Sequence, residues 1–329
     1  MNVAKSLVML SVLGLAAACF AQGYSDGPGM ALGPAIERQP DKPLSVFRDC
    51  REFPEMVVIP LGTFISGFTE KEKLLENNNP NIPPGIQVTI SKAFAIGKYE
   101  LTIAEFRACI DDGVCQFRFG IKDVPTGVMG GMDTNAPPAI VNAIRGEKRG
   151  TPFDSLPMTA LSVEDIKDYL AWISRKTGRV YRLPTRIEWS YAARAGMDNP
   201  YPWGDKPEYN KAFVAGMYDQ DRYPLLEGNS IGGHRHNVGL LPPSAWGLHD
   251  MIGNVEEVVF DCRYQPQAPA PDIATISTAN RNIRICQMGG SDAPVAHGPS
   301  IHTIADAPST STLSAFQHVG VRILSELSE

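Results

Sequence analysis

Hydrophobic and polar positions along the chain form two strand-like runs and several amphipathic stretches. The runs over 55–64 and 88–99 are rich in β-branched and aromatic residues and predict strands. Pro60 is expected to interrupt the first run because proline lacks a backbone N–H. The stretch after Ser162 repeats apolar residues at helical spacing, at Ile166, Tyr169, Leu170 and Ile173. The pattern therefore predicts a mixture of short strands and helices.

The same capping signal precedes each of three predicted helices. A Ser or Thr stands before the helix and an acidic residue follows three positions later, which satisfies backbone N–H groups at the helix start. The pairs are Thr102 with Glu105, Ser162 with Asp165, and Thr185 with Glu188. We expect these acids to cap helices rather than to act in catalysis. Gly178 and Gly196 are expected to end the second and third helices.

The composition indicates a folded, turn-rich protein that does not bind nucleic acid. Hydrophobic residues make up 43% of the chain, and Gly (30) and Pro (27) are abundant, which argues against a helical bundle. Lys plus Arg number 30 against 36 Asp plus Glu, so the formal net charge is -6. No basic run offers the clustered cations that phosphate contacts require.

The chain divides into a leader and one large domain. Residues 22–50 are rich in Gly and Pro and are expected to be a flexible leader, and 51–326 the folded domain. Segments rich in Gly, Pro and Asn, over 66–86, 117–157 and 197–245, predict long irregular loops. Such loops commonly carry a binding site or a partner surface.

The first residues predict export to the periplasm. Lys5 precedes an apolar stretch over 7–18 that is too short to span a bilayer, so 1–21 is interpreted as a signal peptide. Two cleavage positions stay open. Cleavage after Ala21 gives a soluble product, and cleavage before Cys19 gives a lipoprotein with peripheral membrane association.

Export makes disulfides the expected state of the cysteines, because the compartment is oxidising. Cys109 and Cys115 close the segment CIDDGVC at the end of a predicted helix, where we expect a local disulfide. Of the other cysteines we favour a bond between Cys262 and Cys286, which leaves the pairing of Cys50 open.

Eight blocks, in order, resemble the formylglycine-generating enzyme family, also called sulfatase-modifying-factor domains. They are MVVIPLGTF (56–64), KYELTIAEF (98–106), PMTALSVEDIKDYLAWISRKTG (157–178), YRLPTRIEWSYAARAG (181–196), YPWGD (201–205), WGLHDMIGNVEE (246–257), MGGS (288–291) and GVRI (320–323). The resemblance implies a single α+β domain with a C-type-lectin-like core and little regular secondary structure. A buried Arg182 or Arg194 would need an acidic partner, for which Glu188 is a candidate.

The resemblance stops at the redox centre. Family members that make formylglycine hold copper with two cysteines after the glycine pair, but the stretch after Ser291 has no cysteine, and Met288 replaces an arginine. We therefore expect no copper and no sulfatase maturation. His297 and His302 lie in this stretch, but no carboxylate completes an evident metal triad. We interpret the histidines of the chain as solvated or hydrogen-bonded loop residues.

The turn at 253–257 is the better metal candidate by the same resemblance. The family turn holds calcium through an Asn side chain, backbone carbonyls and a Glu, all hard oxygen ligands. The resemblance thus implies calcium at Asn254, Val255 and Glu257, although Glu256 replaces a family tryptophan. The alternative is a structural turn without an ion.

Three functions stay open. Retained scaffold signals without redox residues favour a non-catalytic periplasmic regulator, similar to an exported family member that promotes type VI secretion through a membrane Ser/Thr kinase. Its partner would be the periplasmic domain of that kinase or an outer-membrane lipoprotein. One alternative is a copper-independent oxidase of the kind that completes the pyoverdine chromophore, with Glu256 or Glu257 as base. The other is a calcium-dependent glycan-binding module.

Overall fold

A five-stranded antiparallel sheet forms the centre of the computed structural model, in the order β1-β2-β5-β10-β6. Its strands are β1 (Val46–Phe47), β2 (Met56–Ile59), β5 (Phe94–Gly97), β10 (Leu324–Glu326) and β6 (Tyr181–Arg182). The structure describes residues 39, 42–75, 84–117, 153–206, 208, 211–212, 236–260, 286–288 and 319–327. Since β10 lies between β5 and β6, the sheet joins segments that are far apart in the sequence.

Two smaller sheets complete the strand content of the described residues. β3 (Gly62–Ser66) pairs with β4 (Ile86–Ile90), and β7 (Glu256–Val259) pairs antiparallel with β8 (Cys286–Met288) and parallel with β9 (Val319–Val321). β2 and β3 are separated at Pro60, as the sequence predicts. The predicted strand region after residue 87 is likewise divided into β4 and β5.

The three helices predicted from their capping signals are all present. α2 (Ile103–Asp111), α4 (Val163–Thr177) and α5 (Arg186–Arg194) each begin with a complete capping box. α4 ends at Gly178 in the left-handed conformation, with φ of 66°. α5 ends one residue earlier than predicted, because Ala195 is already left-handed (φ 49°) before Gly196 (φ 78°). The sequence did not predict α1 (Glu70–Leu75), which lies in a segment expected to be irregular.

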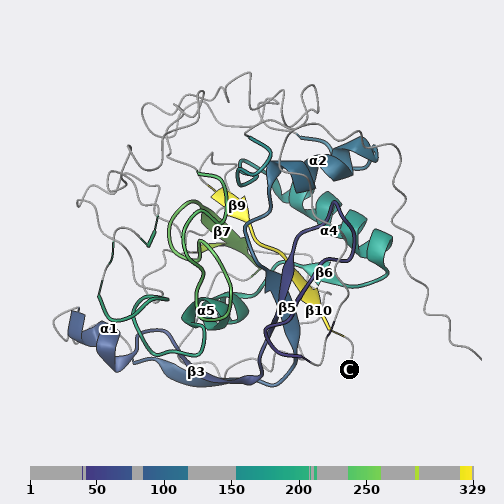
Figure 1. Cartoon of the computed structure of the whole chain (residues 1–329). Helices are drawn as coiled ribbons and strands as arrows, with labels where there is room; N and C mark the ends of the chain where they lie inside the picture. Colours follow the sequence, from purple (N-terminus) through teal and green to yellow (C-terminus); the bar gives the residue numbers. More distant parts are fainter. Residues whose placement is uncertain are drawn as a thin grey trace, which may run out of the picture.

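Two hydrophobic clusters lie on opposite faces of the five-stranded sheet. Side chains alternate along β2, so Met56 and Val58 pack into one cluster while Val57 and Ile59 pack into the other. α2 and α4 contribute to the first cluster and α5 to the second. Figure 1 shows α2 and α4 together on one side of β5 and β10, with α5 on the other side. The helices therefore cover both faces of the sheet.

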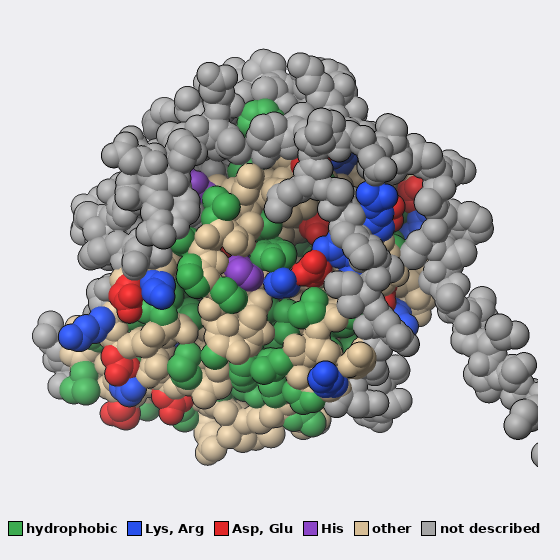
Figure 2. All heavy atoms as spheres, in the orientation of Figure 1, with side chains coloured by type: hydrophobic (Ala, Val, Ile, Leu, Met, Phe, Trp, Pro, Cys, Tyr) green, Lys and Arg blue, Asp and Glu red, His purple; other side chains and the backbone are tan. Residues whose placement is uncertain are grey.

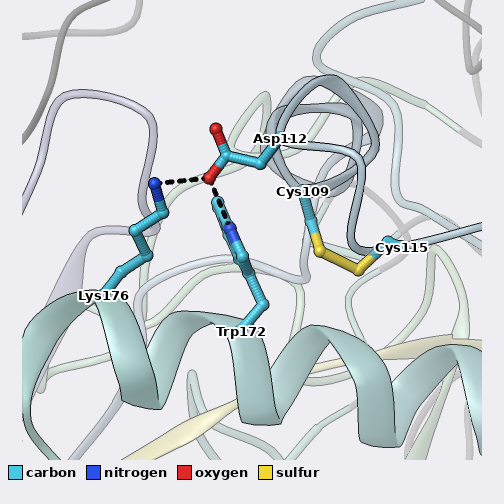
Figure 3. The surroundings of a disulfide bond; sticks show 5 residues. All are labelled: Cys109, Asp112, Cys115, Trp172 and Lys176. Atoms are coloured by element: carbon cyan, nitrogen blue, oxygen red, sulfur yellow. Dashed lines mark hydrogen bonds and ion pairs between the residues drawn. A yellow bond between two sulfur atoms is a disulfide. The ribbon is translucent and has the colours of Figure 1, made fainter.

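A disulfide joins Cys109 to Cys115 at the end of α2, the pair that the sequence predicts. The turn that it closes also carries Asp112. The Asp112 carboxylate accepts a hydrogen bond from Trp172 Nε1 at 2.7 Å and forms an ion pair with Lys176 Nζ at 2.6 Å. Figure 3 shows both donors reaching up from α4 toward Asp112, beside the disulfide. The closed turn thus links α2 to α4.

The folded domain begins before residue 51, earlier than the predicted boundary. β1 pairs with β2, and Phe47 is fully buried against the first cluster, so part of the expected leader 22–50 belongs to the sheet. On the face drawn in Figure 2, acidic and basic side chains lie interspersed rather than in a patch of one sign. Within the described part of the chain, no helix has the length and apolar character of a membrane span.

Candidate functional site

Arg322 joins three distant segments in the interior of the molecule. It lies between β9 and β10, and its side chain is fully buried. The guanidinium donates to the backbone oxygens of Gly97 and His249, both at 2.9 Å, and to the carboxylate of Glu257. The loss of water around a buried cation is thus compensated by several acceptors at once.

Glu257 of β7 is the main acidic partner of Arg322. Arg322 Nε is 3.0 Å from both carboxylate oxygens of Glu257, and Arg322 Nη2 is 2.7 Å from Glu257 Oε1. Trp189 of α5 donates its indole N–H to Glu257 Oε2 at 2.6 Å. Because an ionised carboxylate offers about four acceptor sites, these contacts use the hydrogen-bonding capacity of Glu257. A group held in this way connects β7 to α5 and is a poor general base.

Asn254 fixes the turn that precedes β7. Its backbone is in the left-handed region (φ 57°), which asparagine tolerates better than most residues. Its Oδ1 accepts the backbone N–H of His236 at 2.9 Å, and its Nδ2 donates to the His236 oxygen at 3.3 Å and to Glu100 Oε1 at 3.2 Å. Asn254 therefore docks the segment at His236 against the residues that lead into α2.

Glu100 and Asp250 place two more carboxyl groups beside the same guanidinium. Burial, followed by the nearby charge of Asp250, raises the pKa of Glu100 well above its usual range, and the closest guanidinium atom is 3.9 Å away. Burial also raises the pKa of Asp250 to about 6, although its Oδ2 accepts the N–H of Gly239 at 2.8 Å. The cluster thus contains more acidic groups than its one arginine neutralises, and it favours holding a proton.

The arrangement does not fit the calcium site that the resemblance implies at Asn254, Val255 and Glu257. Calcium takes about six to eight oxygen ligands, yet the oxygens of Glu257 face Arg322 and Trp189, and Asn254 Oδ1 accepts a backbone N–H. Among the residues that the structure describes, no three His, Cys, Asp or Glu side chains are placed to hold a metal. Asn254 and Glu257 lie in one cluster, but their side chains serve other partners.

The two histidines within the described residues have structural contacts. His249 packs on the ring of Tyr99 with 4.9 Å between centroids, and its Nδ1 donates to the Leu241 oxygen at 2.9 Å. Burial, with the charges of Lys98 and Arg322, lowers the pKa of His249, although the bond to Leu241 opposes this shift. His236 is buried, and its backbone binds Asn254. Both fit the interpretation of hydrogen-bonded loop residues.

Several other predicted positions lie outside the described residues. They include the signal peptide, Cys19, Cys262 and the histidines at 234, 297, 302 and 318. Cys286 belongs to β8, but its side chain is not described. Cys50 takes part in a disulfide whose partner side chain is also outside the described part. The predicted bond between Cys262 and Cys286 therefore stays a prediction.

The sequence offered Glu188 as the acidic partner of Arg182 or Arg194, and the structure confirms it for Arg182. Arg182 binds both oxygens of Glu188, at 2.8 and 2.7 Å, as the sequence suggested. Arg194 pairs instead with Glu72 of α1 at 2.9 Å. The carboxylate of Glu188 binds Arg182 and also caps α5 through Thr185.

Sequence reasoning missed the role of Arg322 and Glu100, although both lie in recognised blocks. Arg322 belongs to GVRI and Glu100 to KYEL, but they are far apart in the sequence and meet only in the folded chain. One signal was present: a charged residue inside an otherwise apolar strand sequence must find a partner when it is buried. GVRI contains such a residue.

These features define a mixed α and β domain with little regular structure, as predicted, and the chain belongs to the family of sulfatase-modifying factor enzyme 1-like domains. The family matches residues 43–327. The formylglycine-generating enzyme of Mus musculus is 26% identical over 264 residues, which cover 73% of this chain and 64% of that protein. The inactive C-alpha-formylglycine-generating enzyme 2 of Bos taurus is 36% identical over 104 residues, which cover 31% of each chain.

A third relative, the formylglycine-generating enzyme of Mycobacterium tuberculosis, is 36% identical over 102 residues, 31% of this chain and 32% of that protein. The chain thus spans about one third to two thirds of the length of these relatives.

Solved structures share the fold over a longer span. PvdO from Pseudomonas aeruginosa superposes with a TM-score of 0.63 and 26% identity, covering 87% of this chain and 99% of that chain. Treponema denticola variable protein 1 superposes with a TM-score of 0.53 at 17% identity, covering 83% and 95%, which supports the fold alone.

Proposed function

We propose that this chain is a non-catalytic regulatory protein that uses the formylglycine-generating fold for binding. The proposal rests on one observation above all: the stretch after Ser291, where the family holds copper, contains no cysteine. Without soft thiolate ligands the chain has no counterpart of the family's Cu(I) site. What is left of the family pattern is its scaffold.

The contacts of the candidate bases support the same proposal. Glu257 is 1% exposed and holds Arg322 and Trp189, and Glu256 is also buried in β7. A general base needs access to the proton that it removes. The 36% identity to an inactive family member of Bos taurus over 104 residues is consistent with a scaffold that persists without that activity.

The partner that we propose is the periplasmic domain of a membrane Ser/Thr kinase that controls type VI secretion. This part of the proposal rests on the resemblance, noted from the sequence, to an exported family member that acts in that system. An outer-membrane lipoprotein is the other partner of this class. Binding would place the chain in the periplasm, in line with the signal peptide expected over 1–21.

Purified chain and purified periplasmic kinase domain provide the direct test. We expect a saturable complex by titration calorimetry, and increased autophosphorylation when the chain is added to membranes that contain the kinase. The periplasmic domain of an unrelated membrane kinase is the control bait. Absence of both binding and stimulation would overturn the proposed partner, and turnover of any family substrate would overturn the non-catalytic class.

A second candidate is a copper-independent oxidase, because the superposition with PvdO covers 99% of that chain. Oxygen uptake with dihydropyoverdine separates the two functions. The regulatory proposal predicts the same rate of oxygen uptake as in buffer without protein, whereas an oxidase consumes oxygen in proportion to the protein added. A calcium-dependent glycan-binding role receives less support, since the turn at 253–257 lacks free oxygen ligands on Glu257.

A further inference from the structure

We propose that two copies of this chain pair through strand β4 and form a symmetric dimer with one continuous four-stranded sheet. Among the residues that the structure describes, β4 pairs only with β3, so its other edge is open. An open edge presents backbone N–H and C=O groups that a further strand can bind. The inference does not depend on the proposed kinase partner, because it concerns a different part of the molecule from the buried cluster around Arg322.

The first observation is the length of this edge. β3 and β4 have five residues each and are the longest strands in the described part of the chain. The outer strands of the central sheet, β1 and β6, have two residues each, and very short edge strands are one protection against unwanted pairing. Figure 1 shows β3 along the lower margin of the molecule, and in Figure 2 described side chains rather than grey atoms form the middle of that margin. β4 thus lacks the protection that β1 and β6 have.

The second observation is that the sequence of β4, IQVTI (86–90), carries none of the usual barriers to strand pairing. It contains no charged residue and no proline. Pro84 precedes the strand and Lys92 follows it, so one barrier of each kind stands at its ends. Pairing is therefore confined to the segment between them.

The third observation is that the edge is held in a fixed position. Tyr191 of α5 donates to the Pro60 oxygen before β3 at 3.0 Å, and Arg194 donates to the Gly67 oxygen after β3 at 2.8 Å. Val88 of β4 packs into the second hydrophobic cluster. Because the strand is already ordered, it loses little conformational entropy when another strand binds to it.

The fourth observation identifies the occupant as a second copy of the chain. Ile86, Val88 and Ile90 pack on the second cluster, whereas Gln87 and Thr89 are exposed on the other face. In an antiparallel pair centred on Val88, Ile86 lies opposite Ile90 of the second copy, and Gln87 lies opposite Thr89 of the second copy. Apolar side chains then meet apolar ones, and no like charges meet. A two-fold axis at Val88 uses the same surface on both copies and closes the assembly at two chains.

Sedimentation of the unmodified chain, from submicromolar to submillimolar concentration, tests the dimer directly. We expect a reversible, concentration-dependent shift from one chain to two per particle, because two strands of five residues make a small interface. Amide hydrogen exchange, followed by mass spectrometry, should slow in the segment 86–90 at high concentration. A chain that stays monomeric over the whole range would overturn the inference, even if a strand of another protein binds there.

Charge exchange at two exposed positions of β4 tests the register. Gln87→Lys together with Thr89→Lys places like charges directly opposite each other on both sides of the two-fold axis, so we expect the dimer to weaken by at least about tenfold. Gln87→Glu together with Thr89→Glu should have the same effect, and a mixture of the Lys and Glu proteins should form a heterodimer. Thr63→Lys is the matched control, since Thr63 is exposed on the same face but lies on β3, directly opposite Thr89. It should dimerise like the unmodified chain.

The outcomes of these variants are distinct. A dimer that both charge variants leave intact lies on another surface and would contradict the inference. Recovery of the dimer in the mixture supports it and excludes misfolding as the reason for the loss, because a misfolded variant gains nothing from an oppositely charged partner. If circular dichroism shows that neither variant folds, the concentration dependence of the unmodified chain and its exchange over 86–90 decide.

Discussion

Glu100 is the residue whose environment most directly predicts a measurable property. Its Oε2 is buried and accepts no hydrogen bond within the described residues, while Oε1 accepts from Asn254. Asp250 and Glu257 repel its charged form, and Arg322 attracts it from 3.9 Å. Since burial is the largest influence, the neutral acid is favoured.

The raised pKa of Glu100 predicts that stability falls as the pH rises. The folded state keeps this proton to a higher pH than the unfolded chain, whose carboxyl titrates near pH ~4.3, so the free energy of unfolding decreases through that interval. Asp250, with a pKa of about 6, acts in the same direction from roughly pH 4 to 6. We expect Glu100→Gln to flatten the decline in melting temperature between acidic and alkaline buffers.

The control for this prediction is Glu164→Gln, at an exposed position of α4. It should keep the pH profile of the unmodified chain. Equal slopes for the Glu100 variant and the unmodified chain would show that Glu100 does not hold the proton.

At the scale of elements, a buried ion pair joins α1 to α5. Glu72 and Arg194 are at most 1% exposed, and Arg194 Nη2 also donates to the Gly67 oxygen at 2.8 Å. Glu72 Oε2 accepts the backbone N–H of Thr69 at 2.7 Å, which begins the helix. A helix of only six residues has little stability of its own, so this anchor holds it.

We expect Glu72→Gln to destabilise the fold by about 3 kcal/mol or more, because it leaves the buried charge of Arg194 uncompensated. Glu70→Gln in the same helix is the matched control. Glu70 is exposed and pairs only with Lys73 among the described contacts, so its loss should cost less than about 1 kcal/mol. Urea unfolding measures both values, and equal losses would refute the anchor.

Local signals explain which elements could be predicted from the sequence. Thr102 with Glu105 and Ser162 with Asp165 are three residues apart, so the capping boxes were visible without the fold. Arg182 and Glu188 are also close in the chain. α1 was missed because its partner Arg194 lies 122 residues away. Elements fixed by distant contacts have no comparable signature in one sequence.

In the candidate site, too, residues that are close in the sequence could be predicted, whereas their distant partners could not. Asn254 and Glu257 were identified because they belong to one short block. Their partners were not, since Glu100 lies 154 residues before Asn254 and Arg322 lies 65 residues after Glu257. The sequence therefore placed Glu257 in the turn without showing the guanidinium that contacts it.

At the scale of the whole molecule, β10 is the strand that completes the central sheet. It pairs with β5 on one side and β6 on the other, and Leu324 is fully buried. We expect a chain that ends at residue 322 to lose cooperative unfolding, because β5 and β6 then have no common partner. Circular dichroism during thermal unfolding tests this, with a chain that ends at residue 327 as the control. A sharp transition in the shorter chain would contradict the prediction.

The position of β10 also determines when folding can finish. β2 and β5 can pair as soon as residue 97 is made, but the hydrogen bonds of β5 on its other side need residues 324–326. A ribosome must therefore translate more than two hundred further codons before that gap is filled. During this time the nascent polypeptide exposes an open sheet edge, which creates a demand for chaperones.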